Sequence, residues 1–159
     1  MATDDELGFP TGNANERELL LSWLGYLRAA VHRNAEGLSD DDAHWTPEGA
    51  LISIVGIVNH LTHVEWRWID GGMLGNQVSR SDEEFRPGHE LTIEAALAAY
   101  EQRAAATDAV VRATPLDAPC SRGAHMDLRW VLLHLINETA RHAGHADSTR
   151  ELLDGVTGE

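Results

Sequence analysis

A glutamate and a histidine stand one helical turn apart within an apolar run near the end of the sequence. In "LLHLINETARHAGHA", Glu138 and His142 share a predicted helix face with Leu135 and Ala146. An ionised carboxylate on such a face needs a cation, hydrogen bonds or a proton. A carboxylate oxygen and an imidazole nitrogen at this spacing can both bind one divalent metal ion, which makes the pair a candidate metal site.

A second segment, "GIVNHLTHVEWRWI", offers the third ligand. On a helix, His60 lies next to the apolar face, whereas His63 is turned about 60° to the other side. We therefore expect His60 to face the helix of Glu138 and His142. One metal ion fits better than two, because a dinuclear centre would need two Glu-x-x-His pairs on separate helices, and Glu138 has Arg141 three residues on.

Histidines also occur in helical cores without a metal. In that alternative, His60 and His142 make hydrogen bonds only, and Glu138 pairs with Arg141 or Arg28 where two helices meet. The histidine pairs in "HLTH" and "HAGH" raise the further alternative of a four-histidine site. His145 suits an outer role better, supporting a ligand or interacting with the helix dipole.

Four long segments have the periodicity of amphipathic helices, and no segment alternates long enough to predict a strand. Caps and stops bound them: Asn15 and Gly37 for the first, Thr92 and Pro115 for the third, Asp127 and Gly155 for the fourth. The second ends before Gly71-Gly72, and 39–49 has room for a short helical turn only. The predicted helices cover 15–36, 50–69, 93–113 and 127–154.

These helices predict an all-α fold, a four-helix bundle in a single domain over 15–157 that follows a flexible arm, 1–14. The connection over 70–91 is unusually long for a bundle. About 20 extended residues can span a helix of about 30 Å, so the second and third helices can run parallel, joined by a crossover.

The amino-acid composition, above all the net charge, disfavours some classes of binding partner. Twenty-six acidic residues against 12 basic ones give a formal net charge of -14, which disfavours nucleic acid and anionic membranes. The sequence shows neither a membrane-spanning run nor a signal peptide, so we expect a cytoplasmic protein. Cys120 is the only cysteine, which excludes an internal disulfide; in "DAPCSRG" we expect an incidental loop residue, with a reactive thiol as the alternative.

Together, "GIVNHLTHVEWRWI" and "HLINETARHAGHADSTRELLDG" resemble the DinB/YfiT-like superfamily of metal-binding four-helix bundles, over about 15–157. The closing segment is similar to a branch of mycothiol-dependent enzymes such as maleylpyruvate isomerase. This resemblance implies an up-down-down-up bundle with a crossover. It also implies His60, Glu138 and His142 as metal ligands, with the glutamate in place of the first histidine of an H-x-x-x-H pair.

Three protein ligands leave a coordination position open, as in catalytic zinc sites. The resemblance then implies a metal-dependent thiol transferase or thiol-dependent isomerase that uses mycothiol or a similar thiol with an electrophilic substrate. A hydrolase of a small substrate and a non-catalytic metal-binding bundle are the alternatives. Zinc is the expected ion, although nickel, manganese and iron accept the same donors.

Further residues are candidates for the surroundings of this site. Trp68 shares the face of His60 and is expected to wall a pocket, with the loops 70–91 and 114–126 at its mouth. Arg141 and Arg150 are candidates to hold a carboxylate of the thiol or the substrate, with surface salt bridges as the alternative. Association of two copies into a homodimer is compatible with the pattern but is not demanded by it.

Overall fold

A computed structural model describes residues 8–10, 15–48, 52–123 and 125–158. The all-helical prediction is confirmed: within these ranges, extended backbone pairs only at an isolated bridge between Pro119 and Asp127. The predicted arm over 1–14 falls mostly outside the described residues. The long helices are α1 (Glu16–Ala35), α3 (Ile54–Trp66), α4 (Ile93–Ala113) and α5 (Leu128–Asp154).

The predicted caps explain where these helices begin and end. The side chains of Asn15, Thr92 and Asp127 each accept a hydrogen bond from a backbone N–H in the first turn of α1, α4 and α5. Gly155 ends α5 in the left-handed conformation, with φ at 78°, which glycine adopts without steric cost. The predicted limits of these three helices are therefore confirmed to within one or two residues.

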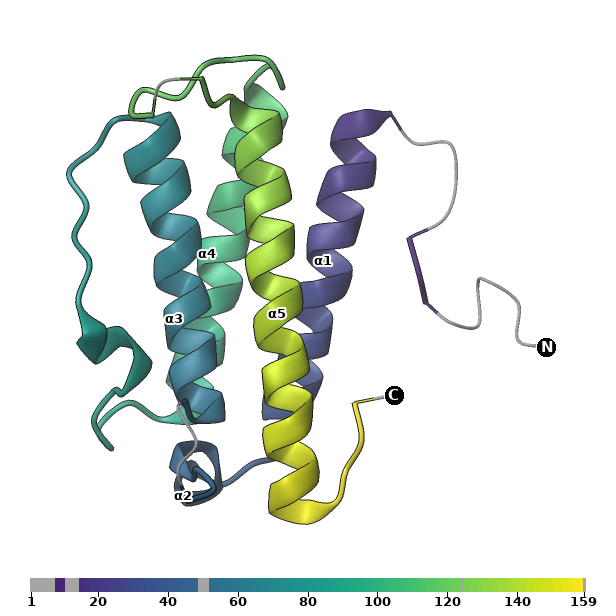
Figure 1. Cartoon of the computed structure of the whole chain (residues 1–159), viewed down its shortest axis with the longest axis vertical. Helices are drawn as coiled ribbons and strands as arrows, with labels where there is room; N and C mark the ends of the chain where they lie inside the picture. Colours follow the sequence, from purple (N-terminus) through teal and green to yellow (C-terminus); the bar gives the residue numbers. More distant parts are fainter. Residues whose placement is uncertain (1–7, 11–14, 49–51, 124, 159) are drawn as a thin grey trace.

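The helices form a bundle in which α1 packs chiefly against α5 and α3 against α4. Figure 1 shows that α3 and α4 run in the same direction, and that the chain between them returns along the outside of α3. The short helix α2 (Asp40–His44) lies at one end of the bundle, in the segment for which a short turn was predicted. No helix of the described residues has the length and apolarity needed to cross a membrane.

The second predicted helix, 50–69, differs from the structure at both ends. Its expected start at Ala50 lies outside the described residues, and α3 begins at Ile54 after the cap Ser53. At the other end the prediction was wrong, because the chain continues through both glycines as the π-helix η1 (Arg67–Met73). A Cβ on Gly71 would lie 2.5 Å from Val78 Cγ2, so this glycine permits close packing rather than ending the helix.

The long connection includes a 3-10 helix, η2 (Asp82–Phe85), which is docked on α3. Asn59 donates a hydrogen bond to the Glu84 carbonyl at 2.8 Å. A Cβ on Gly56 would clash with the carbonyl oxygen of Phe85, so the two backbones approach to a distance that only glycine allows. This approach brings the side chains of η2 against those of α3.

The interior consists of two apolar clusters separated by a polar layer. One cluster includes Ile57, Tyr100 and Ala146, and the other includes Leu24, Val64 and Leu132. On α1, α3 and α5, buried polar side chains occur where the two clusters meet: Arg28, His60, Glu65 and Thr139.

Within this layer Arg28 binds both carboxylate oxygens of Glu65, at 2.8 and 2.7 Å, and one oxygen of Asp108 at 2.9 Å. A bidentate contact of this kind satisfies the buried charge of the guanidinium. The alternative pairing of Arg28 with Glu138 is therefore wrong.

Candidate metal site

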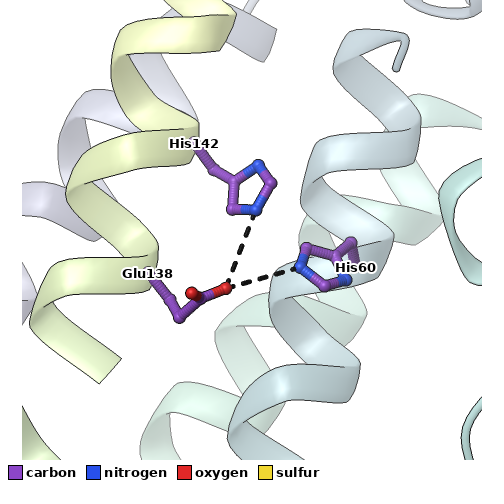
Figure 2. Close-up of side chains that lie close together, drawn as sticks. All are labelled: His60, Glu138 and His142. Carbon is purple, nitrogen blue, oxygen red and sulfur yellow. Dashed lines mark ion pairs between the residues drawn. The ribbon is translucent and has the colours of Figure 1, made fainter. Parts of the chain in front are cut away.

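Three side chains from two helices converge at the edge of the polar layer. His60 comes from α3, and Glu138 and His142 come from successive turns of α5 (Figure 2). Glu138 Oε2 lies 3.8 Å from His60 Nε2 and 3.8 Å from His142 Nε2. One donor atom of each residue lies within 4.8 Å of the other two, so the predicted convergence of these side chains is found in the fold.

The spacing and the unmet charge of this cluster suit a cation. Ligands around tetrahedral zinc stand about 2.0–2.2 Å from the metal and so roughly 3.4 Å from one another. The observed separations of 3.8 Å are too long for hydrogen bonds and leave space between the donor atoms.

The Glu138 carboxylate has little compensation for its burial. No described residue donates a hydrogen bond to it, although its side chain is only 19% exposed. The nearest guanidinium, that of Arg141, lies 3.6 Å from Glu138 Oε1 on a side chain that is 72% exposed. An exposed ion pair at this distance contributes little stability, so a divalent ion among the three donors would satisfy the carboxylate better. The donor set fits the expected metal.

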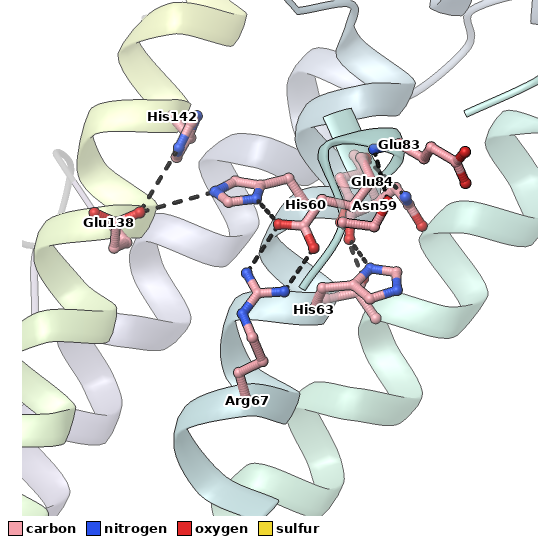
Figure 3. Close-up of polar contacts among 11 residues, drawn as sticks. Asn59, His60, His63, Arg67, Glu83, Glu84, Glu138 and His142 are labelled. Atoms are coloured by element: carbon pink, nitrogen blue, oxygen red, sulfur yellow. Dashed lines mark hydrogen bonds and ion pairs between the residues drawn. The ribbon is translucent and has the colours of Figure 1, made fainter. Parts of the chain in front are cut away.

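The His60 ring is held in one orientation by residues of η2. Figure 3 shows His60 Nδ1 directed at Glu84 Oε1, 2.8 Å away, while the other ring nitrogen faces Glu138 and His142. Arg67 donates hydrogen bonds to both oxygens of Glu84, at 2.5 and 2.8 Å. The Phe85 ring stacks on His60 with centroids 4.2 Å apart.

With Glu84 ionised, Nδ1 of His60 is the donor, and the lone pair of Nε2 is left for a metal. His142 differs, because its Nδ1 is buried without a hydrogen-bond partner among the described residues. Its ring instead lies edge-on against that of His60, with centroids 4.6 Å apart.

Burial decides the protonation states here. Desolvation lowers the pKa of His60 despite the opposing effect of Glu84. Desolvation and the neighbouring His60 lower the pKa of His142 to about 4. Burial alone would raise the pKa of Glu84, but the hydrogen bonds from Arg67 and His60 bring it below its usual value. At neutral pH the cluster therefore presents two neutral imidazoles, the form that binds metals.

A cavity of about 620 Å³ opens beside the cluster and includes His60 and Glu138 in its wall. Trp68 lines this cavity, as predicted, and its ring packs against His134 and Trp130 with centroids 4.6 and 5.2 Å apart. Both predicted loops, 70–91 and 114–126, contribute lining residues. A small molecule in this cavity would contact the cluster directly.

The histidines expected near the site differ in position. His63 points away from the cluster, as Figure 3 shows, with its Nδ1 2.8 Å from the Asn59 carbonyl and its ring against Trp66. His145 follows His142 on α5, is half-buried, and contributes to the lowered pKa of His142. Of the two, only His145 influences the cluster.

The two arginines considered as carboxylate binders lie outside the cavity. Arg141 is largely exposed. Arg150 donates to Asp154 at 2.8 Å and to the carbonyls of Asn34 and Glu36 at 2.9 and 3.2 Å, so it fastens the end of α1 to α5. Arg150 therefore makes an ion pair, as the alternative expected, but its side chain is only 12% exposed, so the pair is partly buried rather than a fully exposed surface contact.

Sequence reasoning missed Glu84, Phe85 and Arg67. Glu84 and Phe85 lie in the connection, where no periodicity indicates which side chains turn inward. Ser81, whose hydroxyl accepts a hydrogen bond from the Glu83 backbone, signals a local turn at "SDEEF". It gives no indication that the turn docks on α3.

Comparisons with known proteins identify a matching family model and a structure of similar fold. Residues 19–155 match the family model described as mycothiol-S-transferase. A crystal structure of a conserved protein from Enterococcus faecalis is similar in fold, with a TM-score of 0.56 at 14% sequence identity, covering 91% of this chain and 100% of that chain. A search among curated proteins finds no match.

Proposed function

Because the chain belongs to the mycothiol-S-transferase family, we propose that it is a metal-dependent transferase of a low-molecular-weight thiol, with mycothiol as the natural thiol. The observation that supports this proposal is the convergence of His60, Glu138 and His142 at the wall of a cavity. Two neutral imidazoles and one carboxylate form a three-ligand set of the kind that catalytic zinc sites use, and such a set leaves a position for an exogenous ligand.

A divalent ion, zinc by preference, held by these residues would stabilise the thiolate of a thiol bound beside it and so make the nucleophile available near neutral pH. The thiol proton passes to solvent, and a sulfur lone pair forms the bond to an electrophilic carbon of the second substrate. The displaced electron pair leaves with a leaving group or, in an addition, takes up a proton from water.

The chain itself contributes orientation and exclusion of water. Glu84 keeps His60 in the tautomer whose Nε2 faces the cluster, and Phe85 covers the face of the same ring. Trp68 and the apolar side chains near it cover the cavity wall, which reduces the water that competes with a thiolate.

Metal and thiol binding test this proposal together. Protein stripped with a chelator and dialysed is titrated with zinc, alongside His60→Ala, Glu138→Ala and His142→Ala, with His63→Ala as the matched control. We expect one ion per chain in the wild type and the control, and a large loss of affinity in the three variants. If all three variants keep the ion, the site assignment is wrong.

Cobalt-substituted protein then reports on the thiol. A thiolate bound to cobalt has a charge-transfer absorption, so addition of mycothiol should produce this band in the wild type and in His63→Ala. Consumption of mycothiol by an electrophile such as monochlorobimane should follow the same pattern among the variants. If the metal binds but mycothiol produces no such band, the protein is a metal-binding bundle without thiol chemistry.

A further inference from the structure

The cavity beside the metal cluster has an unusual charge for this protein. The chain has 26 acidic residues, no lysine and 12 arginines, yet three arginines line this one cavity: Arg67, Arg80 and Arg122. Glu138 is the only carboxylate among the lining residues that the structure describes. We propose that this cavity binds the electrophilic substrate through a carboxylate, held by Arg80 and Arg122; the assignment to the electrophile rests on the proposed function.

Two of these guanidinium groups have no counter-charge in the part of the chain that the structure describes. Arg67 is neutralised by its two hydrogen bonds to Glu84. Within the described chain, no carboxylate pairs with Arg80 or Arg122, whereas most other arginines of the bundle have an acidic partner. In a chain with a net charge of -14, two unpaired cations at one cavity form a local site for an anion.

Arg122 is positioned by the backbone around it. Its N–H donates to the Gly72 carbonyl at 3.1 Å, and its Nη2 donates to the Gly75 carbonyl at 3.2 Å. The neighbouring Ser121 hydroxyl donates to the Met73 carbonyl at 2.7 Å. These contacts tie the loop before α5 to the end of η1, so the guanidinium reaches the cavity with most of its N–H groups available.

Arg80 approaches from a different segment, the connection between η1 and η2. Val78, two residues earlier, packs on Gly71, which holds this part of the connection close to η1. Guanidinium groups from two separate loops can each donate to one carboxylate, and planar arginine groups suit this contact better than any other cation of the chain.

The other lining residues indicate the body of the ligand. A volume of about 620 Å³ is that of a small-molecule site. The wall includes the apolar side chains of Val64, Trp68, Val78 and Met126. A compact, largely apolar acid therefore fits, with its carboxylate at the arginines and its body next to His60 and Glu138.

Binding of a matched acid and amide tests the inference without any metal. The probes are 4-phenylbutanoate and the neutral 4-phenylbutanamide, titrated by calorimetry into stripped, dialysed protein. We expect the acid to bind about tenfold or more tightly than the amide, because charge-assisted hydrogen bonds form with the acid alone. Arg80→Gln and Arg122→Gln should each remove most of this preference.

Arg33→Gln is the control, because Arg33 is an exposed arginine of α1 for which no carboxylate partner is described. It should keep the preference for the acid. Equal affinities of acid and amide in the wild type, or an equal loss in Arg33→Gln, would overturn the inference. Circular dichroism melting verifies that the variants fold, as expected for substitutions of exposed side chains.

A second arm separates the electrophile from the thiol as the source of the carboxylate. Zinc-loaded protein is saturated with the neutral thiol 2-mercaptoethanol and titrated again with 4-phenylbutanoate. Retained binding that still depends on Arg80 and Arg122 supports a carboxylate on the second substrate, whereas competition between the two ligands overturns that assignment. If the wild type binds metal and thiol but shows no preference for the acid over the amide, this inference is overturned and the proposed function stands. If the protein prefers the acid but binds no thiol, the carboxylate site stands and the proposed function fails.

Discussion

At His60, each ring nitrogen has a distinct neighbour. Nδ1 lies 2.8 Å from Glu84, and Nε2 faces Glu138 and His142. A carboxylate behind a ligating histidine fixes the tautomer, limits rotation of the ring and increases its basicity. Among the described residues His142 has no such partner, so the firmly oriented member of the cluster is the one contributed by α3.

Glu84→Gln should weaken metal binding about 10-fold to 100-fold, the range usual for outer partners of metal ligands. The glutamine side chain has one acceptor oxygen and one NH₂ group. It therefore cannot accept hydrogen bonds from Arg67 and His60 at two atoms, as the carboxylate does. Zinc affinity measured by competition with a chromophoric chelator tests this. The neighbouring Glu83→Gln, at an exposed position, is the control, and an unchanged affinity in Glu84→Gln would contradict the role of Glu84.

Cys120 is a second residue whose behaviour follows from its surroundings. Burial, with a smaller effect of Asp127, raises the pKa of the thiol, and Cys120 Sγ lies 3.4 Å from Met73 Sδ. A raised pKa means less thiolate at pH 8, so alkylation by iodoacetamide should be slower than that of a free cysteine of pKa about 8.5.

The alkylation rate of Cys120, followed by intact mass, should continue to rise as the pH is raised above about 8.5, the pKa of a free cysteine. Since Cys120 is the only cysteine, a single added group reports on it alone. Alkylation at pH 8 as fast as that of free cysteine would contradict the assignment and would identify a reactive thiol.

At the scale of elements, local signals were sufficient for three of the four long helices. Asn15, Thr92 and Asp127 cap helices as predicted, since capping depends only on neighbours a few residues away. The stop predicted at Gly71-Gly72 was wrong because Val78, a contact from the connection, requires a glycine there for packing.

The candidate site also combines features that local sequence patterns predict with features that depend on long-range contacts. Helical periodicity placed His60, Glu138 and His142 on inward faces, and the structure brings them together. Glu84 could not be predicted, because its position depends on the docking of η2 against α3, a long-range contact that leaves no periodic pattern in the sequence.

Gly56→Ala tests that docking. The added Cβ would clash with the Phe85 carbonyl, so η2 must move, and we expect destabilisation of about 1–3 kcal/mol. Zinc affinity should fall as well, because Glu84 moves with η2. Gly25→Ala in α1 is the matched control, since a Cβ there meets no atom within 4 Å and helix propensity favours alanine by up to about 1 kcal/mol. Urea unfolding measures the free energy of unfolding of both variants. If Gly56→Ala is stabilised as much as Gly25→Ala, the close approach of Phe85 to Gly56 is refuted.

At the scale of the whole molecule, His60 on α3 lies against Glu138 and His142 on α5 at the polar layer between the two apolar clusters. An ion bound only by the folded bundle stabilises it according to its free concentration. At 100 times the dissociation constant, the gain is about 2.7 kcal/mol. For a domain of this size, that corresponds to a rise in melting temperature of roughly 5–10 °C.

We therefore expect zinc to raise the melting temperature of the stripped protein by that amount, measured by differential scanning calorimetry. His142→Ala should show little rise at the same zinc concentration, because one ligand is missing. An equal rise in both proteins would show that the ion binds elsewhere.

The pairing of α1 with α5 also has a consequence for biosynthesis. Asn34 donates to Asp147 at 2.6 Å across a separation of 113 residues, and Arg150 reaches back to the carbonyl of the same Asn34. On the ribosome, α1 therefore leaves the exit tunnel long before α5, the helix that packs against it. Until α5 emerges, the apolar face of α1 remains exposed. Glu138 and His142 belong to that late helix, so a nascent chain can form the candidate metal cluster only after this part of α5 has been translated.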